Sequence, residues 1–370
     1  MADFQRCTRC IMDNRSDPFI RFDENGRCNY CTEALRLEKN WYYPNAEGAA
    51  KVKEMVKEIK RQGKDHQYDC LMGVSGGLDS SYLAYLASYV WGLRVVGVHI
   101  DDGYDTEISQ KNIEKLTQKA NIKLITIKPD EEQYNALVKA YMKAGVPNLA
   151  APQDNILFAV LYRFAHENHL KYFLSGSNFA LECILQKGNS CSPYDLKNLK
   201  DIHREFGEKP IDKLQFTSSL RKAIDKHILG WKTLCPLDYI DYNRDMAFQE
   251  LNDFCGFEYY GRKHLENYLT AFIQLYWFPK RFNIDKRTSH LSSMIVSGQM
   301  TRERALAELS EPLYDEEYMR KVKELLCHNM NMSLDELEGY VNGPKRQHEN
   351  FKQEKLEPLL KKIYMQVKYH

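Results

Sequence analysis

Short apolar runs alternate with longer polar or amphipathic segments through the first half of the chain. Each run is bounded by glycine or polar residues, which is typical of buried strands. Strands are predicted at residues 68–74, 93–100, 123–127 and 171–175. Helices are predicted between them, at residues 82–87, 112–120 and 155–168. This alternation predicts a parallel sheet with helices on both faces, and therefore an α/β fold.

Helical periodicity replaces this alternation in the second half of the chain. Residues 183–245 are mixed and polar and indicate loops, and a helix-rich region begins at 248–254. The segment 267–278 is apolar and aromatic, and its core-facing positions at helical spacing are Leu269, Phe272, Ile273 and Tyr276. Further helix starts are predicted at Thr301, at Ser310 with Pro312, and at the capping box Ser333–Glu336. The charged, periodic tail 351–370 is expected to be an amphipathic helix.

Composition is that of a soluble globular protein. The 370 residues carry 52 Lys+Arg against 51 Asp+Glu, a formal net charge of +1, and 43% are hydrophobic. This length predicts two or three domains, and this balance excludes a disordered chain, a collagen-like fibre and a strongly basic nucleic-acid coat. No apolar run is long enough to span a membrane, and the start MADFQRCTRC has no apolar stretch typical of a signal peptide. We therefore expect a cytoplasmic protein without membrane contact.

Four of the ten cysteines fall within the first 31 residues. They form two CxxC pairs, Cys7 with Cys10 and Cys28 with Cys31. Paired CxxC turns at this separation are typical of a zinc ribbon, and four thiolates leave no open position, so a structural Zn²⁺ is expected. The alternatives are free thiols or two disulfides. Residues 19–22 indicate a strand between the pairs, Gly26 marks a turn that needs positive φ, and Cys7→Ser is expected to unfold this segment without altering the chemistry.

A glycine-rich turn follows the first predicted strand. Its sequence, SGGLDSS at 75–81, leads directly into the helix at 82–87. Glycines let the backbone approach a phosphate closely, and the helix start offers unpaired N–H groups and the positive end of its dipole. The turn has no GKS or GKT and is not a Walker loop. An anion site is therefore predicted, with a glycine turn that binds no ligand as the alternative.

The string SGGLDSS resembles the pyrophosphate-binding loop (PP-loop) of the ATP pyrophosphatases, an adenine nucleotide α-hydrolase-like superfamily that includes NAD synthetase and GMP synthetase. The resemblance implies that ATP binds here and is cleaved between its α and β phosphates. The residues implied in ATP binding are Ser75, Gly76, Gly77, Asp79, Ser80, Ser81, His99, Asp101, Gly176 and Ser177. The segment GSNFALE at 176–182 resembles the GTxNxxE of NAD synthetase, which implies that Asp79 and Glu182 bind Mg²⁺. Mg²⁺ prefers such oxygen ligands, and the alternative for Glu182 is a solvated acid at a helix start.

Basic residues are concentrated on either side of the apolar segment 267–278. Four cations lie between residues 280 and 287, and the segment 260–264 adds three more donors upstream. Arginine binds phosphate or carboxylate through parallel hydrogen bonds, and lysine adds a point charge. These clusters favour an anionic ligand, with a solvated loop as the alternative.

Four segments in combination resemble the N-acetyl sugar amidotransferases of bacterial surface-polysaccharide synthesis: CTRCIMD…GRCNYC, MGVSGGLDSSYLA, GSNFALE and PKRFNIDKRTSHLSSMIVSGQMTRERAL. The resemblance implies an ATP-dependent, AMP-forming C–N ligase. Its substrate would be an N-acetylated sugar or sugar nucleotide, whose acetamido group becomes an acetamidino group for lipopolysaccharide or O-antigen synthesis. Ammonia would come from a separate glutaminase subunit, similar to that of imidazole glycerol phosphate synthase, with its barrel-type partner. The chain itself shows no glutaminase motif.

The same resemblance assigns roles to individual residues. The expected catalytic residues are Asp79, Ser80, Lys286 and Arg287. The expected sugar-binding residues, without individual assignment, are Asn178, Lys263, His264, Lys280, Arg281, Lys286 and Arg287. The chain is expected to divide into a zinc module (1–45), a PP-loop ATP pyrophosphatase domain (46–245) and a helical substrate- or partner-binding region (246–370).

Two other functions share part of this pattern. The tRNA thiolases also join CxxC zinc modules to a PP-loop, but they need a further reactive cysteine pair and favour a broad basic surface. Cys183 and Cys191 stand eight residues apart and the net charge is +1, so no nucleic-acid partner is expected. A non-catalytic ATP-sensing or scaffold subunit is the second alternative, and the intact loop together with Glu182 disfavours it.

Overall fold

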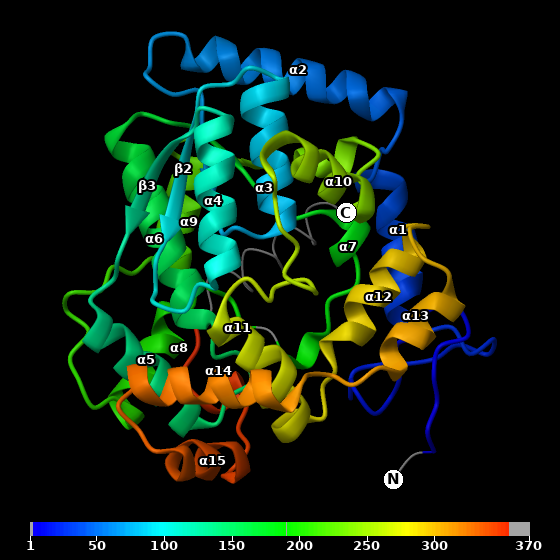
Figure 1. The fold of residues 1–370 in the computed structure, drawn as a ribbon, viewed down its shortest axis with the longest axis vertical. Helices are drawn as coiled ribbons and strands as arrows, with labels where there is room; N and C mark the ends of the chain where they lie inside the picture. The colour runs from blue at the N-terminus through cyan, green and yellow to red at the C-terminus, as the bar shows by residue number, and fades with distance from the viewer. Residues whose placement is uncertain (1–2, 190, 355–370) are drawn as a thin grey trace, which may run out of the picture.

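A computed structural model describes residues 3–189 and 191–354 (Figure 1). Its centre is one parallel sheet of five strands in the order β3-β2-β1-β4-β5. The strands are β1 (Cys70–Gly73), β2 (Val95–Ile100), β3 (Lys123–Ile127), β4 (Tyr172–Leu174) and β5 (Lys232–Leu234). The predicted parallel α/β sheet and its four strands are confirmed. The fifth strand lies in the region 183–245, where the sequence indicated loops.

Helices surround this sheet (Figure 1). In the first half they are α1 (Asn29–Trp41), α2 (Ala46–Gly63), α3 (Leu78–Tyr85) with its π-helical continuation η1 (Leu86–Val90), α4 (Glu107–Lys119), α5 (Glu131–Ala144), α6 (Ala151–Glu167) and α7 (Phe179–Glu182). In the second half they are η2 (Lys187–Asn189), α8 (Leu196–Phe206), α9 (Ser219–His227), η3 (Pro236–Tyr239), α10 (Arg244–Cys255), α11 (Tyr268–Phe272) with its π-helical continuation η4 (Ile273–Phe282), α12 (Lys286–Val296), α13 (Arg302–Ser310), α14 (Glu316–Asn329), α15 (Leu334–Asn342) and η5 (His348–Asn350). No helix in the described ranges is both long and apolar enough to cross a membrane.

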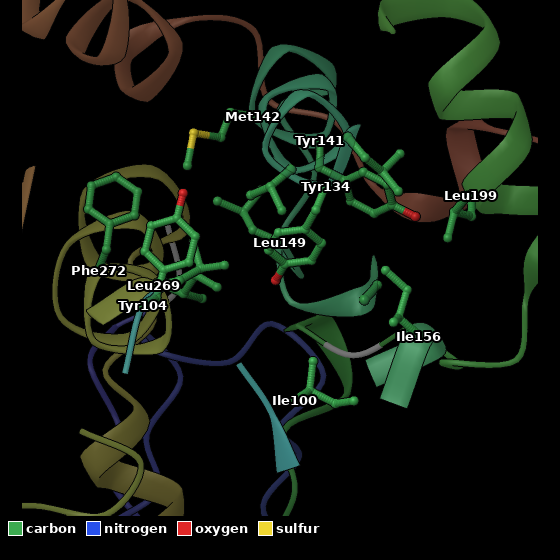
Figure 2. Close-up of a cluster of buried hydrophobic side chains, with 14 of the residues drawn as sticks. Ile100, Tyr104, Tyr134, Tyr141, Met142, Leu149, Ile156, Leu199, Leu269 and Phe272 are labelled. Atoms are coloured by element: carbon green, nitrogen blue, oxygen red, sulfur yellow. The ribbon is translucent and has the colours of Figure 1, made fainter. Parts of the chain in front are cut away.

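Two hydrophobic cores lie on the two faces of the sheet. On β1, Leu71 points into one core, and its neighbours Cys70 and Met72 point into the other. This alternation is the period of two expected of a strand buried on both faces. The core on the Leu71 side contains residues of α5, α6 and the carboxyl-terminal helices, and Figure 2 shows Leu269 and Phe272 of α11 beside Tyr104. The carboxyl-terminal helices therefore share a core with the sheet.

Several local predictions can be compared with the observed elements. Helix starts at Thr301 and Ser333 are confirmed, because each side chain caps the first turn of its helix. The start at Ser310 is wrong, since α14 begins at Glu316 after the cap Asp315. The strand at 19–22 is also wrong, because only Phe22 forms a bridge there, with Cys28. Most of the tail 351–370 lies outside the described residues.

Candidate active site

The carboxyl ends of β1, β2 and β4 open into a cleft of about 620 Å³. The chain order reverses between β1 and β4, and open α/β sheets bind their ligands at such a switch point. The structure brings eleven of the predicted site residues to the lining of this cleft: Ser75, Gly77, Asp79, Ser80, His99, Gly176, Ser177, Glu182, Lys263, His264 and Lys286. The cleft is therefore the candidate active site.

The PP-loop joins β1 to α3 at the base of the cleft. Gly76 has φ +75°, and a Cβ on it would lie 2.7 Å from the Ser109 carbonyl oxygen, so only glycine fits this turn. The Ser75 hydroxyl accepts a hydrogen bond from the Gly77 amide at 3.2 Å and lies 3.1 Å from the Ser80 hydroxyl. The N-cap residue of α3, Gly77, has no side chain that could cap the helix. The loop therefore presents hydroxyl groups and a helix amino terminus to the cleft, which is an arrangement suited to phosphate.

Two carboxylates face each other across one ammonium group. Lys263 Nζ is ion-paired with Asp79 and lies 3.0 Å from Glu182 Oε1. Tyr242 donates a hydrogen bond to Asp79, and Ser177 donates one to Glu182 at 2.7 Å. Burial alone would raise the pKa of Glu182, but the nearby cations, Lys263 first, lower it to about 2. Two ionised carboxylates that already share a cation fit a Mg²⁺ site, because this ion prefers oxygen ligands and few carboxylates.

The end of β2 supplies a buried histidine, His99, with a partner at each ring nitrogen. The His99 Nδ1 atom lies 2.8 Å from the Val74 carbonyl oxygen, and its Nε2 atom lies 2.8 Å from Asp105 Oδ2. The Val74 carbonyl oxygen can only accept, so Nδ1 donates to it, and Nε2 is paired with the Asp105 carboxyl group. Burial opposes a positive charge on the ring, but Asp105 raises the pKa of His99 above its ordinary value. The β2 end of the cleft thus carries a buried imidazole that is held by the Asp105 carboxyl group.

Helix α12 forms the wall opposite the PP-loop with Lys286 and His290. Burial, with Lys263 nearby, lowers the pKa of Lys286 to about 8. Burial and the charge of Lys286 hold the pKa of His290 well below its ordinary value. Within the described ranges, neither side chain has a hydrogen bond or an ion pair, although the His290 ring lies 5.6 Å from that of His264. The Lys286 ammonium group and the His290 ring nitrogens are therefore available to a ligand.

Some residues expected at the nucleotide or sugar lie outside this lining. The Ser81 side chain is fully buried in α3. The Asp101 carboxylate pairs with Lys128 at 2.8 Å. Asn178 caps α7 by accepting a hydrogen bond from the Leu181 amide at 2.9 Å. Their side chains shape the elements beside the cleft and do not line it.

The cations of the basic stretch 280–287 lie in different environments in the structure. Lys280 is exposed over the Tyr276 ring, and Arg287 is ion-paired with Asp285 at 2.8 Å, in a smaller cavity next to the cleft. Arg281 is 1% exposed. Its guanidinium donates to five main-chain carbonyl groups, those of Gly145, Tyr340, Val341, Gly343 and Pro344. Arg281 is therefore a structural residue, which corrects its expected role in sugar binding, because its Nη1 and Nη2 atoms donate to these carbonyl groups and its Nε atom is buried without a partner in the described chain.

The structure adds cleft residues that the sequence did not single out. Tyr260 accepts a hydrogen bond from the Leu78 amide at 2.8 Å, at the start of α3. One oxygen of Glu266 is buried without a partner in the described chain. Asp154, in the first turn of α6, has its pKa raised to about 6 by burial, although His264 opposes this. Tyr260 and Glu266 lie within two residues of the basic segment 262–264, and this proximity was the available signal.

The amino-terminal cysteines form a second candidate site. The ligand atoms of Cys7, Cys10, Cys28 and Cys31 are buried and lie within 4.8 Å of one another. Two of the sulfur–sulfur distances are 3.7 and 3.6 Å, close to the edge of about 3.8 Å that a Zn–S distance of about 2.3 Å requires in a tetrahedron. Gly26 has φ +72°, as the predicted turn requires. The donor set therefore fits a structural Zn²⁺.

Comparisons with known proteins match two parts of the chain. Residues 266–368 match the family described as LPS biosynthesis protein WbpG-like, C-terminal domain, and residues 50–185 match the NAD synthase family. This chain joins a PP-loop domain of the NAD synthase type to a WbpG-like domain. The resemblance to PP-loop enzymes of surface-polysaccharide synthesis is confirmed at this level. The PP-loop domain holds Asp79 and Glu182, and the WbpG-like domain holds Lys286 and His290.

Individual proteins that resemble this chain share less than a third of the aligned residues with it. A stretch of 109 residues is 28% identical to the glutamine-hydrolyzing GMP synthase of Vesicomyosocius okutanii subsp. Calyptogena okutanii and covers 29% of this chain but only 20% of that synthase. The NH3-dependent NAD synthetase from Campylobacter jejuni is 16% identical with a TM-score of 0.29, over 57% of this chain and 97% of that chain. The NMN synthetase from Francisella tularensis is 14% identical with a TM-score of 0.28, over 58% and 98% of the two chains.

Proposed function

We propose that this chain is the synthetase subunit of an ATP-dependent, AMP-forming amidotransferase that converts the acetamido group of an N-acetylated sugar or sugar nucleotide into an acetamidino group for lipopolysaccharide or O-antigen synthesis. One observation carries the proposal. Lys286 and His290 of the WbpG-like domain stand unpaired in the same cleft as Asp79 of the PP-loop domain. A nucleotide on the PP-loop would therefore meet a sugar held by the domain type that is found in lipopolysaccharide synthesis.

The amide must first be activated, because ammonia does not displace the oxygen of an unactivated amide. The amide oxygen attacks the α-phosphorus of ATP, the bond to the β-phosphate oxygen breaks, and pyrophosphate leaves. Ammonia then adds to the carbon of the O-adenylyl imidate. The carbon–oxygen bond breaks, and AMP departs with the former amide oxygen. The amide nitrogen loses its proton as the imidate forms, and the amidinium product keeps all three hydrogens of ammonia, one of them moved to the sugar nitrogen.

The residues of the cleft suit these steps. Ser75, Ser80 and the start of α3 would hold the phosphates, and this placement stabilises charge that develops in the transition state. Asp79 and Glu182 would hold Mg²⁺, which when bound neutralises phosphate charge. Lys263 lies between them and adds a further positive charge. Lys286 faces this group from α12, where its nitrogen can contact the sugar or the α-phosphate.

The rival thiolase function is less well supported. Thiolation needs a reactive cysteine near the adenylated carbon. Among the described residues, no cysteine lines the cleft. Ammonia suits this site better, and we propose that a separate glutaminase subunit supplies it, similar to that of imidazole glycerol phosphate synthase with its barrel-type partner.

The decisive experiment follows the amide oxygen. The protein is incubated with ATP, Mg²⁺, ammonium chloride and a panel of N-acetyl and diacetamido sugar nucleotides that carry an isotopically heavy acetamido oxygen. We expect pyrophosphate, a sugar product lighter by the difference between oxygen and NH, and the heavy oxygen in AMP. Pyrophosphate release with tRNA but with none of the sugars would contradict the proposal and favour thiolation.

A further inference from the structure

The start of α6 brings a carboxylate and two apolar side chains to the cleft on one face of the helix. Asp154, Leu157 and Phe158 all line the cleft, and each is half-buried. Residues three and four positions apart lie on the same face of a helix, so Leu157 and Phe158 stand one turn from Asp154. This face of α6 therefore presents a charged acceptor beside an apolar surface.

The Asp154 carboxylate is unpaired in the described chain. Within residues 3–189 and 191–354, no hydrogen bond and no ion pair reaches it. The titratable groups that interact with it electrostatically come from three other segments: His264 beside α11, Tyr134 of α5 and Cys191 before α8. Burial raises the pKa of Asp154 to about 6, although His264 opposes this. At neutral pH the carboxylate is thus mostly ionised, and it accepts a proton more readily than an ordinary aspartate.

The other acids that line the cleft are engaged elsewhere. Asp79 and Glu182 share one ammonium group, and Asp105 holds an imidazole ring. Glu266 lies against the PP-loop, since a Cβ on the second glycine of that loop would lie 2.7 Å from Glu266 Oε1. Among the lining acids of the described chain, Asp154 is therefore the one without a partner that does not lie against the phosphate-binding turn.

An acetamido group has needs that match this face of α6. Its carbonyl oxygen must stay free to attack the α-phosphorus, so the protein has to hold the group through its N–H and its methyl group. A carboxylate accepts a hydrogen bond from the N–H, and apolar side chains contact the methyl group. The N–H must also lose its proton as the imidate forms, which requires a base within hydrogen-bond reach.

We propose that this face of α6 is the acetamido subsite, where Asp154 accepts the N–H and takes its proton while Leu157 and Phe158 contact the methyl group. The proposal rests on the proposed amidotransferase function. The amide oxygen bonds to the α-phosphorus as pyrophosphate leaves, and the nitrogen lone pair forms the C=N bond of the imidate. The N–H bond breaks, its electron pair stays on nitrogen, and the proton moves to Asp154 and then to solvent. Asp154 is thus a catalytic residue of the adenylation step.

The test isolates the adenylation step, which needs no ammonia. The rate of sugar-dependent exchange of labelled pyrophosphate into ATP is measured between about pH 5 and 9, with N-acetyl and diacetamido sugar nucleotides. Asp154→Asn keeps the shape and an acceptor oxygen but takes no proton. We expect it to lower the exchange rate at pH 7 by about 10²–10⁴-fold, with KM for ATP unchanged. The rate of the parent protein should fall as the pH drops through about 6, and this acid limb should be absent from the variant.

Three further variants complete the test. Glu167→Gln is the matched control, because Glu167 is an exposed acid on the same helix and does not line the cleft, and it should behave as the parent protein. Glu266→Gln removes the other acid that could serve as the base, and it should keep the acid limb. Leu157→Ala enlarges the methyl site, so we expect the ratio of kcat/KM for a propionamido analogue to that for the acetamido sugar to rise several-fold.

The outcomes separate the subsite from the function. An acid limb and a rate that persist in Asp154→Asn, or an acid limb lost only in Glu266→Gln, would overturn the subsite and leave the amidotransferase function standing. An unchanged preference in Leu157→Ala would remove the methyl contact. If the parent protein shows no exchange with any sugar nucleotide, the function fails and the subsite with it. Because folding raises the pKa of Asp154, its ionisation opposes folding at pH 7, and Asp154→Asn should be no less stable than the parent in denaturant unfolding.

Discussion

The ammonium group of Lys263 is the central charge of the cleft. It lies between Asp79 of the PP-loop domain and Glu182 of α7, and these three side chains form one half-buried charge network. Each carboxylate has a second donor, Tyr242 for Asp79 and Ser177 for Glu182. The network is satisfied within the protein, and it also presents ionised oxygen ligands to the cleft.

Neutralising either carboxylate tests the proposed metal site. We expect Asp79→Asn and Glu182→Gln each to lower pyrophosphate release by about 10²–10³-fold, because each removes a negative charge that would hold the Mg²⁺ that neutralises the phosphates. The fold should persist, since Lys263 keeps one carboxylate partner. Asp101→Asn is the control, because Asp101 pairs with Lys128 outside the cleft lining. Equal losses in all three variants would contradict this placement of the metal ligands.

At Lys286 we expect a substitution to affect activity and stability in opposite directions. The pKa of Lys286 falls from 10.5 to about 8, so folding disfavours its charged form. Below pH 8 the full penalty applies, and stability rises as pH increases from about 8 towards 10.5, because the unfolded chain then binds more protons. We therefore expect Lys286→Met to be more stable than the parent at pH 7, by on the order of 2 kcal/mol, and less active.

The measurement is denaturant unfolding of both proteins at neutral and at alkaline pH. The difference between them should shrink as the pH is raised. Lys280→Met, at an exposed position, should change neither stability nor activity. A Lys286→Met protein that is less stable than the parent at pH 7 would show that Lys286 has a stabilising partner.

At the scale of elements, η4 contains a residue of the basic stretch 280–287 that stabilises the packing of distant helices. The last turn of this π-helical segment contains Arg281, whose guanidinium joins the residue that follows α5 to the end of α15 and the chain after it. The side chain is buried over the Trp277 ring, with 4.5 Å between the guanidinium carbon and the ring centroid. Helices that are distant in sequence are thus held by one residue.

Removal of this anchor should destabilise the protein without changing its chemistry. We expect Arg281→Met to lower the free energy of unfolding by about 3 kcal/mol or more, because it leaves buried carbonyl groups without donors. KM for ATP and for the sugar should be unchanged per folded molecule. Denaturant unfolding together with steady-state kinetics distinguishes the roles, and normal stability with a raised sugar KM would restore Arg281 as a sugar ligand.

At the scale of the whole molecule, the amino-terminal module supports the active site. Arg302, at the start of α13, donates to the carbonyl groups of Cys7 and Cys10 at 3.1 Å each. The Ile11 amide donates to Ser292 of α12 at 3.2 Å. Helix α12 carries Lys286 and His290, so the module lies behind the wall that faces the PP-loop. This contact alters the expectation from sequence that loss of the module would leave the chemistry unchanged.

Metal removal tests this coupling. We expect the protein to contain zinc in stoichiometric amount, and Cys7→Ser to lose both the zinc and much of the activity, because α12 then loses its support. The sheet should remain folded, as far-ultraviolet circular dichroism would report. Cys255→Ser, at a single half-buried thiol on α10, should keep both zinc and activity. Full activity in a zinc-free Cys7→Ser protein would show that the module is independent of the site.

The sequence was informative wherever a property depends on neighbouring residues. The PP-loop, the paired CxxC turns and the four apolar strands are local patterns, and each was predicted at its observed position. The region 183–245 was harder, because β5 is three residues long and its pairing with β4 supplies its stability. Helices α8 and α9 were missed for a related reason, since each buries only part of one face.

In the candidate site, too, local features were predicted from the sequence and long-range contacts were not. Asp79, Glu182, Lys263 and Lys286 were named individually from motifs and charge. The sequence did not predict that these residues meet in one group. Lys263 is 184 residues from Asp79 in the sequence, and Tyr242 is 163 residues from it. Arg281 and Lys286 belong to one basic stretch in sequence, yet one holds main-chain carbonyl groups and the other faces the cleft.

The sequence by itself determined the fold class, the glycine turn between β1 and α3 and the two CxxC pairs, because chain geometry over a few residues sets each of them. Only the tertiary structure decided which cations face the cleft and that the amino-terminal module contacts α12 and α13. The physical reason is that such contacts depend on how distant segments pack. A single packing arrangement sets them together, and no local pattern of residues specifies it.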